Sequence, residues 1–329
     1  MKFDLDQEQR DFAASIDAAL GAADVPGAVR AWSQGDPEQG RQVWNQLAEL
    51  GVTALAVPEE FDGIGAHPVD LVLAIEALGR WCVPGPVVES IAVAPILLAG
   101  SPDAGSQLAA LAAGELIATA ALPPHTPRVL DAQVADLVLL AEGGQVSTAQ
   151  AGTRHASVDP SRTLFDVVVD AATGATWAAD TARAYEMGAL ATAAQLIGAG
   201  QAMLNTAVDY AKQRTQFGRV IGGYQAIKHK LADVHIALEL ARPLVYGAAL
   251  SLADSAAGPL HADTARDVSA AKVAASDAAL LAAHSALQTH GAIGFTSECD
   301  LSLWLLRVQA LRPAWGDPTA HRRRVLEAI

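Results

Sequence analysis

The sequence predicts a mainly helical protein with a small β region inserted between two helical parts. Alanine dominates a composition that is 51% apolar but only 5% aromatic, which favours helices packed closely through small side chains. Apolar residues recur at helical spacing towards both ends of the 329-residue chain, whereas short β-branched runs gather near its middle. We therefore expect an N-terminal helical domain over residues 1–120, a reduced β domain over 121–178 and a C-terminal helical bundle over 179–329.

The first 120 residues carry a helical pattern that turns interrupt. Phe12, Ile16 and Leu20 recur at helical spacing, and residues 69–78 form another apolar stripe. Gly79 follows that stripe and is expected to cap its helix, because glycine commonly ends helices. These stripes predict several helices packed around one core.

Three short segments in the middle of the chain are expected to be strands. Residues 134–141 form an apolar run that ends at a pair of glycines, and residues 164–169 are rich in β-branched side chains. Residues 176–178 are the third candidate. The stretch is long enough for a few strands but small for a separate barrel.

Long helices are predicted from about residue 181. Leu190, Ala194 and Ile197 share one helical face, and a second sustained stripe covers residues 227–241. Such lengths suit a four-helix bundle. Pro243 falls inside the second pattern and is expected to kink that helix or adjust it locally.

Charge and cysteine content narrow the classes of partner. A net charge of −14 repels nucleic-acid phosphates and anionic lipid, so we expect neither partner, although a few local cations can still hold a small polyanion. We find no signal segment and no apolar run of spanning length. Cys82 and Cys299 offer neither a disulfide framework nor a metal set, which fits a reducing cytoplasm.

Two segments of the C-terminal part carry residues suited to phosphate binding. The first is Arg-Thr-Gln-Phe-Gly at 214–218, followed by Gln225. A guanidinium donates in a planar fork that matches phosphate oxygens and stays charged at any working pH. The second is Gln-Thr-His-Gly-Ala-Ile-Gly-Phe at 288–295, where Gly291 and Gly294 let the backbone approach an anion.

These segments, and the order of the three regions, resemble the acyl-CoA dehydrogenase family over nearly the whole chain. The opening is similar too, in residues 3–10 (FDLDQEQR), 44–51 (WNQLAELG), 57–65 (VPEEFDGIG) and 76–79 (EALG). Asp62 and Ala292 stand where that family usually has glycine. The resemblance implies an acyl-CoA dehydrogenase-like fold and FAD as cofactor.

The resemblance also implies roles for single residues. The counterpart of Arg214 reaches across a dimer interface to the pyrophosphate of a neighbour's FAD, Phe217 would pack on the adenosine side, and Gln225 would hydrogen-bond the same cofactor. Gln288 and Gly291 belong to a second adenine and pyrophosphate contact.

Simpler interpretations of these residues stay open. Arg214 would cap the C-terminal end of the preceding helix, with Phe217 in the core, and Gly291 would only terminate a helix. His284 and His290 are expected to be packed or interface residues, and no spacing here predicts a metal site.

The same resemblance predicts an incomplete catalytic centre. The loop and the tryptophan segment that line the flavin in that family have no counterpart in the early β region, and Trp177 comes too late to replace them. The family's two base positions fall at Gly316 and near Gly188, and glycine cannot abstract a proton. Glu186 and Asp317 are the nearest carboxylates, and we expect both to be solvated surface groups.

The leading hypothesis is therefore a shortened subunit of a heteromeric, FAD-dependent acyl-CoA dehydrogenase, inactive alone and without a catalytic residue of its own. A homologous full-length partner would supply the flavin walls and the base, in a heterotetramer that dehydrogenates an acyl-CoA thioester between its α and β carbons. Such paired chains resemble actinobacterial enzymes of steroid side-chain β-oxidation, and an electron-transfer flavoprotein-type acceptor is compatible with this.

Two alternatives remain. One is a self-sufficient homo-oligomeric acyl-CoA dehydrogenase that uses Glu186 or Asp317 as a displaced base. The other is a flavin-free scaffold or regulatory subunit. The retention of Arg214, Gln225 and Gln288 argues against the scaffold, which has no use for a phosphate fork.

Overall fold

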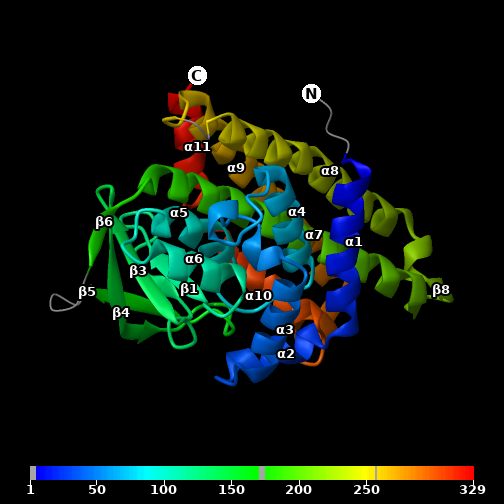
Figure 1. Ribbon diagram of the computed structural model, residues 1–329. Coiled ribbons are helices and arrows are strands. Elements are labelled where there is room, and N and C mark those ends of the chain that lie inside the picture. The colour runs from blue at the N-terminus through cyan, green and yellow to red at the C-terminus, as the bar shows by residue number, and fades with distance from the viewer. Residues whose placement is uncertain (1–4, 170–174, 256–257) are drawn as a thin grey trace.

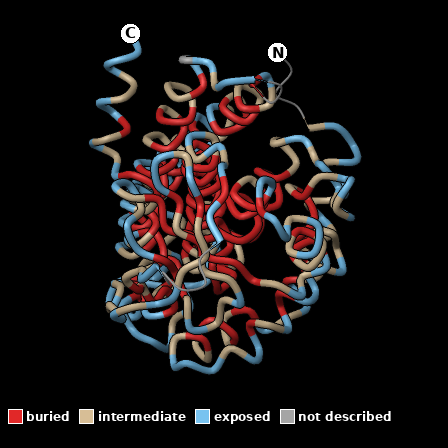
Figure 2. Tube along the Cα trace, turned by 60° about the vertical axis from the view of Figure 1, so that its left-hand side comes forward, coloured by how far each residue is buried: buried red, intermediate tan, exposed pale blue. Residues whose placement is uncertain are grey.

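The computed structural model describes residues 5–169, 175–255 and 258–329. N-terminal helices, a sheet and a bundle of long helices follow one another along the chain, with the sheet at one side of the molecule (Figure 1). Buried residues gather along the interior helices, and exposed residues along the outer turns (Figure 2). The predicted fold class, mainly helical with a small β insert, is confirmed.

The N-terminal part is built from short and medium helices. They are α1 (Gln7–Ala22), α2 (Val25–Ser33), α3 (Glu38–Glu49), α4 (Pro68–Arg80), α5 (Ala94–Leu98) and α6 (Ala104–Ala112), with 3-10 turns at Val52–Ala54 and Glu59–Phe61 and a π-helical stretch at Val88–Val93. Asp6 and Gln9 form a capping box that starts α1. The predicted cap at Gly79 is wrong, because α4 continues through this residue to Arg80.

One sheet follows the N-terminal helices. Its strands are β1 (Ala118–Ala121), β2 (Val129–Leu130), β3 (Leu137–Glu142), β4 (Gln145–His155), β5 (Leu164–Val169) and β6 (Thr176–Ala178). The order is β1-β3-β4-β5-β2, with β6 also on β4; β1 and β3 are parallel, and the other pairs are antiparallel. The three strands expected from sequence are present. The long central strand β4 was missed, because Val146 is its only fully buried residue.

Long helices form the C-terminal part. They are α7 (Thr181–Gln213), α8 (Gln225–Asp254), α9 (Ala262–His290), α10 (Leu301–Leu311) and α11 (Pro318–Glu327). A hairpin of β7 (Thr215–Gln216) and β8 (Arg219–Val220), followed by a 3-10 turn at Ile221–Gly223, joins α7 to α8. A further 3-10 turn, Gly291–Phe295, follows α9. Pro243 lies inside α8 without ending it.

Helices α7 and α8 are long and apolar enough, by length and composition, to cross a membrane. The expectation that no apolar run reaches spanning length is therefore not met by these two helices. The apolar window of α7 is 94% buried inside the protein, so α7 is the central helix of the bundle, whereas the window of α8 is only 39% buried.

Helices α4 and α7 cross with their backbones in close contact. A Cβ built on Gly79 would collide with the carbonyl oxygen of Gln195, and one built on Gly198 would collide with that of Glu76. Glycine at both positions therefore lets the N-terminal helices pack directly on the centre of the bundle.

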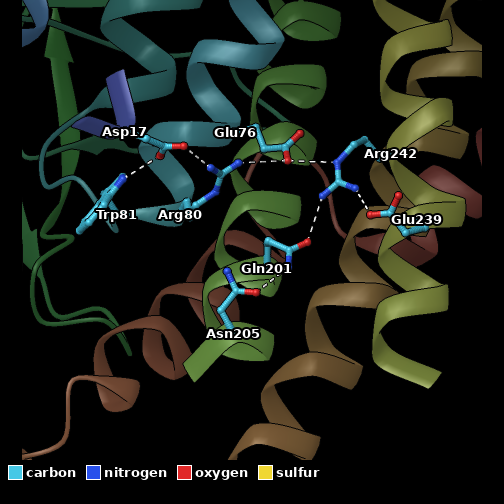
Figure 3. A network of polar contacts seen from close by, with 8 residues as sticks. All are labelled: Asp17, Glu76, Arg80, Trp81, Gln201, Asn205, Glu239 and Arg242. Carbon is cyan, nitrogen blue, oxygen red and sulfur yellow. Dashed lines mark hydrogen bonds and ion pairs between the residues drawn. The ribbon is translucent and has the colours of Figure 1, made fainter. Parts of the chain in front are cut away.

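A polar network surrounds this crossing (Figure 3). The buried carboxylate of Glu76 lies between two cations, 3.1 Å from Arg242 Nε on α8 and 3.7 Å from Arg80 on its own helix. Burial raises the pKa of Glu76, and the two guanidiniums oppose that shift. Arg80 in turn pairs with Asp17 of α1, and Arg242 donates to Gln201 of α7 at 3.2 Å. The network joins four helices at one place.

Arg307 of α10 ties the sheet to both helical parts. Its buried guanidinium donates to Asp159 at 2.6 Å and to Ser161 Oγ at 3.0 Å, both between β4 and β5, and to the carbonyl of Val83 at 3.0 Å. These hydrogen bonds are all buried, so they fix the position of the sheet relative to the helical bundle.

We predict that Gly198→Ala lowers the free energy of unfolding by about 1–3 kcal/mol or more, because the added methyl group meets the α4 backbone. Gly247→Ala is the matched control, since its Cβ meets nothing within 4 Å in the interior of α8. That change should stabilise the chain by up to about 1 kcal/mol. Urea unfolding measures both; equal effects would contradict the close crossing.

Candidate half of a dinucleotide site

Two segments that are distant in sequence meet at one end of the bundle. The end of α7, the hairpin that follows it, the start of α8 and the end of α9 line a cavity of about 520 Å³. It contains the predicted residues Arg214, Phe217, Gln288 and Gly291. We call it the hairpin cavity. Gln225 does not line the cavity, although its two neighbours in sequence, Tyr224 and Ala226, do.

The hairpin holds an aromatic side chain out in solvent. Phe217 and Gly218 both have positive φ (52° and 80°), as a two-residue turn of the twisted type requires. Phenylalanine is unfavourable in that conformation, and this one is 92% exposed. The interpretation that Phe217 belongs to the core is therefore wrong. An exposed aromatic ring on a rigid turn is suited to packing on another flat ring.

The Arg214 side chain has no hydrogen-bond or ion-pair partner among the described residues. Its backbone N–H bonds to Tyr210 and its carbonyl accepts from Ile221, so the backbone ends α7 and starts the hairpin. In the described part of the chain its guanidinium makes no hydrogen bond and no ion pair. The side-chain cap proposed as the simpler interpretation is thus not formed, and the cation is free to bind an anion.

The start of α8 adds backbone donors beside this cation. Tyr224 is its N-cap residue and gives no side-chain cap to the first turn, where Gln225 lies. The guanidinium carbon of Arg219 stacks 3.8 Å above the centroid of the Tyr224 ring, and the hydroxyl of Tyr224 donates to the carbonyl of Gln216. These contacts hold the hairpin against the helix. Uncapped amides at a helix N-terminus favour phosphate.

The end of α9 completes the hairpin cavity. Gly291 has φ 69° and ends the helix, because its N–H donates to the carbonyl of Leu287. The expected helix-ending role of Gly291 is therefore present. Gln288 accepts from Lys230 of α8 at 2.5 Å. His290 is buried and stacks on Tyr210 with ring centroids 4.3 Å apart, as a packed histidine, whereas His284 is exposed. The turn beyond exposes Phe295 by 75%.

The hairpin cavity can bind a phosphate-bearing ligand but cannot enclose one. It offers an unpaired guanidinium, a helix N-terminus and an exposed aromatic ring, which suit a diphosphate joined to a flat base. The cavity is open to solvent on the side of the hairpin, because residues 212–220 are all exposed. These features fit the adenine and pyrophosphate half of FAD.

The two positions of a family base lie far from this cavity, and both are filled. A Cβ on Gly188 would collide with the ring of Trp315, and one on Gly316 would lie 2.6 Å from both Tyr185 Oη and His321 Nε2. Trp315 is itself buried at positive φ (57°) and donates to Glu89 at 3.1 Å. Neither position has room for a carboxylate side chain.

Buried polar groups hold the turn that carries Trp315. Lys272 of α9 donates to the carbonyls of Arg312 at 2.9 Å and Gly316 at 3.3 Å, and His321 Nε2 donates to the carbonyl of Trp315 at 2.9 Å. Burial lowers the pKa of Lys272 to about 7 and that of His321 to about 4. The neutral histidine accepts from Ser269 through its other nitrogen. These hydrogen bonds hold the backbone of Trp315 in place.

The two nearest carboxylates are occupied in different ways. Glu186 is buried and pairs with Arg324 of α11, whose second nitrogen lies 3.4 Å from the other carboxylate oxygen. The expectation that Glu186 is solvated is therefore wrong; burial raises its pKa, although Arg324 opposes the shift. Asp317 is exposed and caps α11, accepting from Thr319 and Ala320 at 2.7 and 3.1 Å. These backbone bonds lower its pKa.

Comparison with known proteins identifies the class. Residues 6–115 match the model of the acyl-CoA dehydrogenase N-terminal domain, and residues 177–329 match that of the C-terminal domain. Acyl-CoA dehydrogenase IpdE2 of Mycobacterium tuberculosis is 34% identical over 307 residues, which cover 91% of this chain and 90% of that protein. The chain belongs to the acyl-CoA dehydrogenase family.

Solved structures share the fold. A chain of the ChsE4–ChsE5 complex from Mycobacterium tuberculosis superposes with a TM-score of 0.82 at 22% identity, covering 99% of this chain and 98% of the other. A variant of the Tcur3481–Tcur3483 steroid ACAD gives 0.84 at 20% identity, covering 98% and 97%.

Sequence reasoning missed the residues that fill the base positions. Trp315 gives no signal in sequence, because its position depends on a positive φ that aromatic residues rarely adopt. Gly188 offered one signal: a glycine inside a long helix suggests close packing.

Proposed function

We propose that this chain is the shortened subunit of a heteromeric, FAD-dependent acyl-CoA dehydrogenase and binds the cofactor together with a partner subunit. The observation that carries the proposal is the separation of two regions along one helix. Gly188 lies near the start of α7 and Arg214 just beyond its end, about 39 Å apart at the rise of an α-helix. In Figure 1 the hairpin with β8 and the sheet lie at opposite sides of the molecule.

This separation exceeds the reach of one dinucleotide, so the hairpin cavity serves a cofactor whose flavin lies in another chain. Arg214 would bind the pyrophosphate, the first turn of α8 with Gln225 would donate to it, and Phe217 would pack on the adenine. Bound FAD supplies the acceptor for the hydride that leaves the β carbon of the acyl-CoA. The homologous full-length partner would supply the walls around the flavin and the carboxylate base.

The filled base positions argue against the self-sufficient homo-oligomer. A base must reach the carbon-bound proton, and Trp315 occupies the space that a side chain at Gly188 would need. Glu186 pairs with Arg324, and one carboxylate oxygen of Asp317 accepts the two hydrogen bonds that cap α11. Neither is free to approach a substrate without giving up its present partner.

The exposed Phe217 and the unpaired Arg214 argue against a flavin-free scaffold. An aromatic residue at positive φ and in solvent costs stability, which is expected where a ligand or a partner contacts it. A scaffold that had lost the cofactor would gain by replacing it.

Relatives suggest the remaining features. The structural neighbours are a ChsE4–ChsE5 complex and a steroid ACAD, which supports an assembly of two kinds of chain, such as a heterotetramer, and a steroid side-chain acyl-CoA as substrate. An electron-transfer flavoprotein would reoxidise the cofactor. We also propose a cytoplasmic location, because the two cysteines offer no disulfide framework.

Arg214→Lys, made in the co-expressed complex, should weaken FAD retention although the charge is preserved. Lysine cannot form the two-pronged contact with pyrophosphate, so we expect a loss of about 1–3 kcal/mol, roughly fivefold to 150-fold in affinity. Lys212→Ala is the control, because Lys212 is an exposed cation two residues away that does not line the cavity. Flavin absorbance after dilution and filtration gives the answer; equal retention in both variants would remove Arg214 from the cofactor site.

Glu186→Gln and Asp317→Asn should leave turnover of the complex within a few fold of wild type, because neither carboxylate is available as a base. Asparagine is as good a helix cap as aspartate, and glutamine keeps an oxygen for Arg324. Loss of a general base typically costs about 100-fold to 10,000-fold. A fall of that size for either variant, with flavin content and assembly intact, would move the base into this chain and favour the self-sufficient enzyme.

A further inference from the structure

A second cavity lies between the sheet and the segment after α10, far from the hairpin cavity. Its volume is about 200 Å³, and we call it the Arg162 cavity. Polar groups enter it from three sides: Arg162 from the β4–β5 connection, Glu89 from the π-helical stretch and Thr126 from the loop before β2. Leu164, Pro313 and Trp315 line its apolar part.

Arg162 is a buried cation without a partner. The residue is only 6% exposed, yet in the described part of the chain its guanidinium makes no hydrogen bond and no ion pair. Burial lowers its pKa, and the nearby charge of Glu89 opposes that shift without contacting the guanidinium. A buried charge is costly unless it is paired, so this arrangement calls for an anion in contact with it.

The carboxylates that could have neutralised Arg162 are engaged elsewhere. Asp159 binds Arg307 and Ser161, and Asp131 accepts from the backbone of Thr163 and from Trp32. Both acids therefore bind other groups, and the guanidinium of Arg162 is left at the lining of the cavity.

Two further polar atoms at the cavity lack partners. Glu89 is 3% exposed; its Oε1 accepts from Trp315, whereas its buried Oε2 has no hydrogen bond. The buried hydroxyl of Thr126 also has none. A carboxylate oxygen accepts and does not donate, so Glu89 requires a donor on whatever lies next to it.

We propose that the Arg162 cavity binds a small carboxylate that carries a hydroxyl or ammonium group on the adjacent carbon. The ligand carboxylate pairs with the guanidinium fork of Arg162, its donor bonds to Glu89 Oε2, and Thr126 bonds to the remaining oxygen. The apolar end of the ligand contacts Leu164 and Trp315. A cavity of about 150 Å³ holds benzene, so this one suits a molecule of roughly six to ten non-hydrogen atoms.

The mixed charge of the cavity excludes simpler ligands. A plain anion would meet the carboxylate of Glu89 without offering it a donor, and a metal cation would be repelled by Arg162. A molecule that carries both a negative charge and a donor pairs with Arg162 and also satisfies Glu89. The site belongs to this chain alone and does not rest on the function proposed above.

Calorimetric titration of the full-length chain with four matched compounds tests this inference. They are 2-hydroxybutyrate, 2-aminobutyrate, butyrate and 2-hydroxybutanamide. We expect saturable binding of the hydroxy acid or of the amino acid, and the stronger of the two identifies the donor. Butyrate lacks the donor and the amide lacks the charge, so each should bind roughly tenfold more weakly or worse.

Variants locate the binding. Arg162→Gln should abolish it and Glu89→Gln should weaken it at least about tenfold, whereas Arg322→Gln should not change it. Arg322 is the matched control, because it is a surface arginine that pairs with Asp277 and does not line the cavity. Thermal unfolding of each variant checks that the fold is intact. Absence of saturable binding by both acids, equal binding of butyrate, or binding that survives Arg162→Gln in the folded protein would each overturn the proposal.

Discussion

The contact between α4 and α7 is the constraint on which the rest of the molecule depends. Two glycines, Gly79 and Gly198, let the helix backbones touch, and the buried Glu76 beside them binds cations from α4 and α8. Helix α7 runs through the centre of the protein as one helix of 33 residues. One end of α7 meets the sheet and the Trp315 turn, and the other carries the hairpin with Arg214. The distance between the two ends is therefore set by helix geometry.

Much of the fold could be predicted from sequence, because the spacing of apolar residues matches the face that each helix or strand buries. The stripe at residues 227–241 became α8, and the β-branched run 164–169 became β5. The failures have physical causes. Strand β4 is central in the sheet but fully buries only Val146, so it lacks the alternation by which strands are recognised. Gly79 looked like a helix cap, but its role depends on a helix more than a hundred residues later in the chain.

The candidate site was predictable in part. The segments at 214–218 and 288–291 do meet at one cavity, which their motifs suggested, whereas Gln225 lies just outside its lining. The filling of the base positions was not predictable, since Trp315 depends on a backbone conformation that its residue type disfavours. Glu186 was expected in solvent, and its pairing with Arg324 arises only from the packing of α11 near the start of α7. Unpaired buried groups such as Arg162 have no sequence signature, because they are defined by what does not surround them.

The central claim is that this chain binds one half of a cofactor whose other half lies in a partner. The ratio of FAD to polypeptide tests it most directly, measured from released flavin and from amino-acid analysis. It should be determined for this chain alone and for the complex purified with a homologous full-length subunit. The account predicts no retained FAD in the chain alone and one FAD for each pair of unlike chains. One FAD for every chain, or a full complement in this chain by itself, would contradict it.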